Sequence, residues 1–547
     1  MLRKLLSTLI VSLIVISAFS SCGNPGANGK LVLPIDSEPA YLDPQIISDD
    51  GARMIMLNCM EGLMSYDADG NLVPAAADSF DISSDGLVYT FRLRSDGRWR
   101  VTTLAGAILG EDYAETFDTR VTAADFAFAL KRAIEPSTIC PSASLLMNIK
   151  NAVAVHEGSA DVSRLGVRAT DDYTLKITLE RRDDDFLSVL AEACCLPCNE
   201  IYFNATGGRY GLSTSYLIYN GPFYISNWAD GTSISLRRNY LYHDLGDDAV
   251  AKEVLPSSVY FSFNSEQATR DRKLRDETYH LAFLTDSQAE ELNGNKRVKI
   301  KGFASSMLTL MFNCGDEIVS NAKLRMAVAH GLDYKVFEEY GERASSLLPH
   351  GLLLGGVSAR NAVNIELLES NRKLAGKLFA QALDELEKNR IKLTLLCDAD
   401  DEMLARTAIQ SLQSTFGVVF GIEVETADSE TLQKRIASGD YQIVLNKLRF
   451  SGSSAKAALR AFASNNSANH AFFSSAAYDR LLDEVCTAGS KKETAKAVRR
   501  AEKYLTDRAV IIPLVTESTL YGVSSKCEGV IFYPSGEVAL FKQTAVR

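Results

Sequence analysis

Segments with the period of a strand and segments with the period of a helix alternate along most of this chain. Val88–Arg94 and Thr174–Leu179 alternate apolar and polar side chains, which predicts strands. Apolar residues in Ala123–Ile134 recur at helical spacing, with Thr122 in place to cap the helix. Because interspersed helices and strands pack as layers, we expect an α/β protein with mixed sheets.

The same alternation continues to the end of the chain. Further helices are predicted at 321–331, 366–386, 401–416 and 478–507, and one beginning near Asp50 as its cap. Further strands are predicted at 31–35, 233–237, 308–313, 391–396, 422–426 and 441–445. The 547 residues are enough for about three to four domain-sized units, and no fixed-period repeat is visible.

The first residues are typical of an export signal rather than of a folded element. Arg3 and Lys4 precede an apolar run over 5–19, which is shorter than the ~20 residues that cross a bilayer. The small residues that follow end at Cys22, as in bacterial lipoprotein signals; plain secretion is the alternative. We therefore expect 1–21 to be a signal peptide and Cys22 to carry a lipid. On this interpretation 22–30 is a tether, and the rest lies outside the membrane, facing the periplasm or the exterior.

Composition and motifs argue against several classes of function. The formal charge of −11 disfavours nucleic acid as a partner. No G-x-S-x-G, H-E-x-x-H, phosphate-binding loop or dinucleotide-binding glycine pattern occurs. The acidic run Asp183–Asp185 is interpreted as a solvated turn rather than as a general acid and base. We expect a binding protein without a cofactor rather than an enzyme.

Cys194, Cys195 and Cys198 are the only cysteine cluster in the sequence. A metal or redox site would be one interpretation. The six histidines are scattered and no second cysteine pair stands at ligand spacing, so we expect buried apolar residues and no metal site.

Short motifs in a fixed order then link the chain to a known family. They are Glu38–Pro44, Glu61–Leu63, Tyr89–Arg94 with Trp99, Val121–Phe126, Leu165–Ala169 with Tyr173–Leu175, Asn220–Phe223 with Trp228, Leu324–Ala327, Tyr478–Asp479 and Pro513. Together they resemble the extracellular solute-binding proteins of peptide-type ABC transporters (family 5), in particular the oligopeptide-binding branch. Gly62 and Gly221 are placed to permit close turns, and Trp99 and Trp228 to anchor cores.

The resemblance implies a two-lobed fold like that of the periplasmic binding proteins (class II, Venus-flytrap), with an extra domain inserted in the first lobe. On this pattern lobe I consists of 31–60, 186–275 and 505–547, and 61–185 is the inserted domain. Lobe II is 276–504. Residues 100–120 are longer than the family pattern, and we interpret them as a surface insertion rather than as part of the cleft.

The resemblance also implies where a ligand lies. One strand-like segment follows the L-D-P motif, at Ser48, Asp49 and Asp50. Another follows the strand that begins near Tyr441 and spans 448–453, including Leu448, Arg449, Phe450 and Ser451. Lys447 directly precedes it. Thr516 and Glu517 approach the ligand from the strand that follows Pro513. Main-chain hydrogen bonds from such segments would bind peptides of varied sequence.

Ser451 stands where the family has the aspartate that pairs with a peptide's α-amino group. Asp49, Asp50 or Glu517 is a candidate replacement, although Asp50 could instead serve only as a helix cap. Lys447 and Arg449 could bind a ligand carboxylate, or they could form a solvated rim.

We therefore expect a monomeric receptor that delivers peptides or peptide-like solutes to an ABC permease and its ATPase. There are two alternatives. In one, the same fold binds an oligosaccharide or a metal chelate. In the other, the protein is a sensor lipoprotein that no longer transports.

Overall fold

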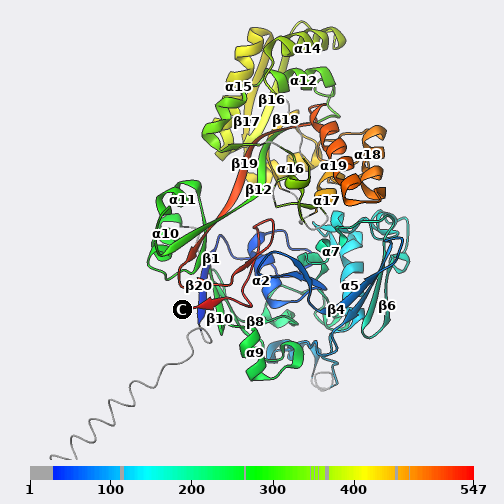
Figure 1. The fold of residues 1–547 in the computed structure, drawn as a ribbon, viewed down its shortest axis with the longest axis vertical. Coiled ribbons are helices and arrows are strands. Elements are labelled where there is room, and N and C mark those ends of the chain that lie inside the picture. Colours follow the sequence, from blue (N-terminus) through cyan, green and yellow to red (C-terminus); the bar gives the residue numbers. More distant parts are fainter. Residues whose placement is uncertain are drawn as a thin grey trace, which may run out of the picture.

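The computed structural model describes residues 29–547 except 111–115, 264–265, 345, 350, 355–356, 364–368, 450–453 and 467. The predicted signal peptide, Cys22 and nearly all of the predicted tether lie outside the described residues. The chain forms two lobes (Figure 1). We call lobe I the part that shares one hydrophobic core between residues 31 and 263 and between 521 and 541. Lobe II is the part built on two further cores between residues 307 and 515.

Two sheets form the frame of lobe I in the described part of the chain. The first has the order β1(Lys30–Ile35), β10(Ser258–Phe263), β9(Ser233–Arg238), β8(Phe223–Ala229), and only the β1–β10 pair is parallel. The second is antiparallel, with the order β4(Ala77–Ile82), β5(Val88–Leu93), β7(Thr174–Thr178), β6(Val167–Asp171). Helix α5(Ala123–Ile134) packs on β6 and β7 through Phe126, Leu130 and Ala133. The predicted strands and the predicted helix of this region are confirmed.

The other elements of lobe I are short. They are α2(Asp50–Cys59), β2(Met64–Tyr66), β3(Leu72–Pro74), α3(Thr103–Leu109), α6(Ala152–His156), α7(Phe186–Val189), α8(Glu200–Ala205), α9(Asp247–Glu253), β20(Cys527–Glu528), β21(Ile531–Phe532), β22(Ala539–Leu540) and β23(Ala545–Val546). The 3-10 turns of lobe I are η1(Pro136–Thr138), η2(Ala143–Leu146), η3(Val162–Arg164), η4(Ala193–Cys195), η5(Thr214–Tyr216) and η6(Tyr242–Asp244). Those of lobe II are η7(Tyr334–Tyr340), η8(Ala399–Asp401) and η9(Gly417–Val419).

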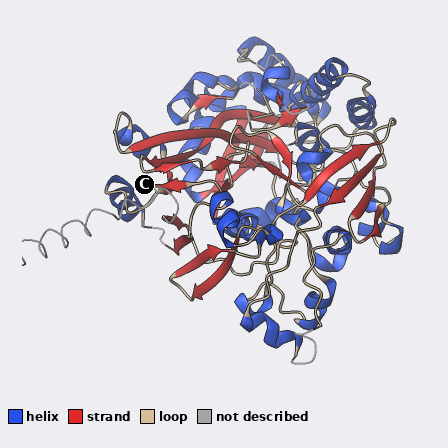
Figure 2. Ribbon diagram, turned by 60° about the horizontal axis from the view of Figure 1, so that its bottom comes forward, coloured by secondary structure: helices blue, strands red, loops and turns tan. Residues whose placement is uncertain are grey.

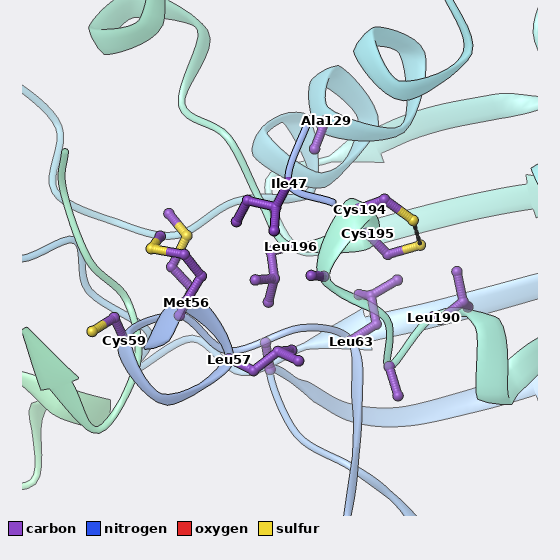
Figure 3. Packing of buried hydrophobic residues seen from close by; sticks show 14 of the residues in the cluster. Ile47, Met56, Leu57, Cys59, Leu63, Ala129, Leu190, Cys194, Cys195 and Leu196 are labelled. Carbon is purple, nitrogen blue, oxygen red and sulfur yellow. Dashed lines mark hydrogen bonds between the residues drawn. The ribbon is translucent and has the colours of Figure 1, made fainter. Parts of the chain in front are cut away.

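The centre of the lobe I core surrounds α2 (Figure 3). Met56 and Leu57 from this helix lie toward Leu196, whereas Cys59 lies on the side of the helix away from Cys194 and Cys195. Cys194, Cys195 and Cys198 are all buried, as predicted. Burial raises the pKa of the Cys198 thiol to about 12, so this sulfur is a protonated apolar group at neutral pH.

Of the two tryptophans predicted to anchor cores, one is fully buried and the other is half-buried. Trp99 is fully buried and its Nε1 donates to Asp125 at 3.2 Å, so it anchors a core. Trp228 is only half-buried and donates to Glu38 of the E-P-x-x-L-D-P motif at 2.5 Å.

In the described part of the predicted insertion at 100–120, α3 packs on α8 and η5 at the surface of lobe I. Glu111, Asp112 and Glu115 lie outside the described residues.

Gly221 allows two backbone segments to meet. Its N–H donates to the carbonyl of Cys59 at 3.0 Å. A Cβ on Gly221 would stand 2.6 Å from the carbonyl carbon of Cys59 and from the nitrogen of Met60. Neither backbone atom can yield without moving the end of α2, so the predicted close turn is confirmed.

We expect Gly221→Ala to lower the free energy of unfolding by about 2 kcal/mol, because an added methyl overpacks the site. The shift in the urea midpoint measures this loss. Gly376→Ala is the matched control, since a Cβ there meets nothing within 4 Å inside α14(Arg372–Glu385). That change should stabilise the protein by up to about 1 kcal/mol. Equal midpoints for Gly221→Ala and the unaltered protein would contradict the packing argument.

Lobe II is built on one mixed sheet. Its order is β11(Leu281–Leu284), β19(Ile511–Ser524), β12(Val298–Phe312), β18(Ile443–Arg449), β16(Ile391–Asp398), β17(Phe420–Ala427), with β13(Glu342–Arg343) beside β19. The strands β16, β17 and β18 are parallel, and the other pairs are antiparallel. Along β12, Met307 and Met311 enter one core, whereas Leu308, Leu310 and Phe312 enter the other. This period of two places a core on each face of the sheet.

Helices cover both faces of this sheet, because the helical residues 324–329, 379–382 and 404–412 enter one core, whereas 432–436, 455–459, 478–485 and 497–505 enter the other. Figure 2 shows blue helices outside the red strands. The remaining elements between residues 267 and 506 are α10(Gln267–Arg275), α11(Asp286–Leu292), α12(Ala322–Gly331), β14(Leu353–Leu354), β15(Val357–Ser358), α13(Ala359–Ala362), α14, α15(Glu402–Phe416), α16(Ser429–Ser438), α17(Ala455–Arg460), α18(Ala476–Thr487) and α19(Lys491–Thr506). The helix predicted over 478–507 is two helices, because the chain turns at Gly489 and Ser490 caps α19. The helix predicted from 366 begins only at Arg372, behind the cap Asn371.

A ribbon of two long strands connects the lobes. β12 has 15 residues and β19 has 14, and both run from the side of lobe I to the sheet of lobe II (Figure 1). Their pairing extends from Met311 opposite Ile511 to Val298 opposite Ser524, with register shifts between Ala304 and Ser306 and between Leu308 and Thr309. Such irregularities bend a strand locally, so this segment is a candidate hinge. Among the described residues, no helix has both the length and the apolar character needed to cross a bilayer.

Candidate functional site

A cavity of about 860 Å³ lies between the lobes. Its lobe I wall contains Ser48, Pro141, Ser144 and Leu145. Its lobe II wall contains the ends of β16 and β18 and one side of α17, together with Phe462 and His470. The volume is in the usual range for sites that enclose a small ligand.

The end of β18 brings three of the predicted residues to this cavity. Lys447, Leu448 and Arg449 all line it. The Lys447 ammonium lies 2.5 Å from the carboxylate of Glu517 on β19, which also accepts a hydrogen bond from Ser306 at 3.2 Å. Lys447 and Glu517 are thus a pair beside the candidate hinge. Phe450 and Ser451 lie outside the described residues.

The segment after the L-D-P motif meets β18 from the other lobe. Asp49 is the cap of α2, with its carboxylate accepting from the Ala52 N–H at 2.7 Å, so the prediction that Asp50 caps the helix is wrong. Asp50 is the first helical residue instead, 3.1 Å from Arg53 and 3.4 Å from Arg449. Burial raises the pKa of the Asp49 carboxyl. Asp50 is therefore the member of this segment that connects the lobes.

The remaining predicted site residues differ in whether they line the cavity. Ser48 lines the cavity. Thr516 pairs with Met307 on one side and Glu342 on the other, within the sheet. Asp49, Asp50, Thr516 and Glu517 are not part of the cavity wall.

Three carboxylates that sequence reasoning missed also line the cavity: Asp398, Asp400 and Asp401. Asp398 ends β16, and Asp400 and Asp401 follow it. The carboxyl ends of parallel strands are where ligands of open α/β sheets bind. In the sequence, the acidic run at the end of an apolar strand could have pointed to these residues. Burial raises the pKa of the Asp401 carboxyl, and the nearby Glu517 carboxylate raises it further.

A second ion pair between the lobes is buried. Lys456 on α17 is 5% exposed and lies 3.5 Å from Asp183 and 3.9 Å from Asp185. The prediction of a solvated turn at Asp183–Asp185 is therefore wrong for two of the three residues, because lobe II covers them. Asp184 remains at the surface and pairs with Arg182. A third, exposed pair joins Arg181 to Asp483.

Within the described ranges, no three His, Cys, Asp or Glu side chains are grouped so that they could hold a metal ion. The cavity is thus bounded by charged pairs, amide and hydroxyl groups and apolar side chains. Two α/β lobes that meet over such a cavity and share a strand ribbon define a two-lobed solute-binding protein.

The comparisons identify the family. Residues 71–470 match the description "Bacterial extracellular solute-binding proteins, family 5 Middle". This chain belongs to the family 5 bacterial extracellular solute-binding proteins.

Similar proteins extend over almost the whole chain. The dipeptide-binding protein DppE of Bacillus subtilis is 24% identical over 530 residues, covering 94% of this chain and 92% of that protein. A probable deoxycholate-binding periplasmic protein of Escherichia coli, YgiS, is 26% identical over 490 residues, covering 87% and 86%. The structure of Listeria monocytogenes OppA bound to peptide has a TM-score of 0.76 and 22% identity, covering 95% of this chain and 99% of that one. This likeness confirms the predicted two-lobed fold.

Proposed function

We propose that this protein is a receptor that captures peptides or peptide-like solutes between its lobes and delivers them to an ABC permease. The observation that carries the proposal is the cavity of about 860 Å³ at the meeting of two lobes joined by a strand ribbon. The names of relatives support peptides as the ligand class, since DppE and an OppA are described as binding dipeptides and peptide.

Binding would follow from closure of the lobes. A peptide lying along the end of β18 could bond to main-chain groups of 447–451, while Ser48–Asp50 approaches from lobe I. Lys447 and Arg449, which line the cavity, would then face the peptide's charged groups, with Glu517 and Asp50 as the partners that orient them. Asp49 and Thr516 would support the adjoining backbone rather than contact the ligand.

We also propose the division into an inserted domain at 61–185, a lobe I of 31–60, 186–275 and the C-terminal segment, and a lobe II that begins at 276. Leu505, Val510 and Leu514 are buried in the lobe II cores, which supports an end of lobe II near residue 515 rather than 504. The protein would act as a monomer and as a receptor rather than as an enzyme. It would be anchored outside the membrane by a lipid on Cys22.

Native mass spectrometry of a chain beginning at residue 23, purified gently from a bacterial host, tests the ligand class. Because closure buries the ligand, we expect a set of added masses in the peptide range that disappears on mild denaturation. An adduct-free mass, together with no thermal stabilisation by di- to pentapeptides, would contradict the proposal.

A further inference from the structure

The interlobe cavity holds more negative charge than its own cations neutralise. Its lysine and its arginine are already paired, Lys447 with Glu517 at 2.5 Å and Arg449 with Asp50 at 3.4 Å. Asp398, Asp400 and Asp401 share the wall with them. Among the described residues, no lysine, arginine or histidine nitrogen lies within the 4.0 Å of an ion pair from these three carboxylates.

The local fold does not require all of this charge. Asp398 has a structural role, since it accepts from the Asp400 N–H at 3.1 Å and from the Ser429 hydroxyl at 2.5 Å. Asp401 stands at the start of α15 but makes no side-chain capping bond. A helix N-terminus offsets only about half of one unit charge. The negative charge of Asp400 and Asp401 is therefore larger than the partial positive charge at the start of the helix.

The surroundings do not supply the missing cation either. His470 is the only histidine of the described cavity wall, and burial lowers its pKa, so it is neutral at pH 7. Asp401 lies near both Glu517 and Lys447, and that lysine is already paired with Glu517. Asp398 and Asp401 are partly removed from water, whereas Asp400 is exposed at the rim. An unpaired charge that is partly removed from water costs more free energy than one at the surface.

We propose that the cavity selects ligands that carry a basic group, a lysine or arginine side chain in the case of a peptide, which lies among Asp398, Asp400 and Asp401. This inference rests on the proposed peptide receptor function and specifies its ligand class. A basic group supplies the absent counter-charge as the lobes close. An acidic side chain meets like charge in the same place, so the arrangement selects against acidic peptides as well as for basic ones.

Titration calorimetry with the tripeptides Ala-Lys-Ala, Ala-Gln-Ala and Ala-Glu-Ala tests the inference. The unaltered protein should bind them in that order, with at least about a tenfold difference between the lysine and the glutamate peptide. In the double variant Asp400→Asn/Asp401→Asn this difference should fall below about threefold. Asp384→Asn is the matched control, an exposed acid at the end of α14, and should leave the difference unchanged.

The outcomes separate this inference from the function on which it rests. Equal affinities for the three peptides would overturn the charge selection and leave the receptor function in place. A preference for lysine that survives in the double variant would overturn the assignment to these carboxylates. Failure of all three peptides to bind protein with a normal thermal transition would count against the peptide receptor itself, and the inference would fail with it.

Discussion

Lys456→Met is expected to weaken ligand binding by about 10- to 100-fold, although this side chain is not on the cavity wall. Lys456 is buried between Asp183 and Asp185 of the other lobe. It also occupies the first turn of α17, where the helix dipole disfavours a cation. These costs are offset only while the carboxylates are in place. Removing the ammonium leaves two buried acids facing an apolar group, which disfavours the closed arrangement of the lobes.

Calorimetry with a ligand found by native mass spectrometry measures the loss, and small-angle scattering measures the compactness of the free protein. The variant should be more expanded than the unaltered protein. Arg181→Ala is the matched control because its pair with Asp483 also joins the two lobes but is half exposed, and such pairs contribute less than about 1 kcal/mol. Unchanged affinity and unchanged compactness in Lys456→Met would show that the buried pair does not influence closure.

Arg132→Met is expected to lower the free energy of unfolding by about 3–5 kcal/mol, because it leaves a buried carboxylate without its partner. The Arg132 guanidinium lies 2.5 Å from Asp43 and donates to Gln45 at 2.7 Å, with its face 4.2 Å from the ring centre of Phe203. Asp43 and Arg132 are both buried. Asp43 is the aspartate of the L-D-P motif, so this contact gives the motif a structural role.

Urea unfolding followed by circular dichroism measures that loss. The double variant Asp43→Asn/Arg132→Met separates the charge from the packing, since it removes the unpaired carboxylate and keeps a side chain of similar volume. We expect it to recover more than half of the lost stability. A single variant Arg132→Met with an unchanged midpoint would refute the role assigned to the pair.

The sequence was informative wherever a feature depends on neighbouring residues. Strands such as Val88–Leu93 and helices such as Ala123–Ile134 followed from periodicity, and the two-lobed fold followed from the resemblance. The break at Gly489 was missed, because the apolar period of α18 and α19 continues across it.

Site residues were harder to predict because their environment is created by the other lobe. The run Asp183–Asp185 is hydrophilic by every local measure, yet Asp183 and Asp185 are buried and face Lys456 of the other lobe. The cavity wall includes three carboxylates at the end of a strand, those of Asp398, Asp400 and Asp401. No local sequence pattern shows that this strand ends at a cavity, because the cavity lies between two lobes. By contrast, Lys447 and Glu517 were predicted from separate segments, and the sheet brings them within 2.5 Å of each other.

The strand ribbon has a consequence for the order in which the chain can fold. β19 pairs with β11, β12 and β13, and the residues directly after it complete the core that begins with β1. Neither lobe has all of its strands until residues 511–541 have been made. Contacts this distant in sequence form slowly, so a nascent chain remains incompletely folded for nearly all of its synthesis. A ribosome that stops before residue 511 releases a chain in which both lobes are incomplete: the sheet of lobe II lacks β19, and the core of lobe I lacks the side chains of residues 521–541.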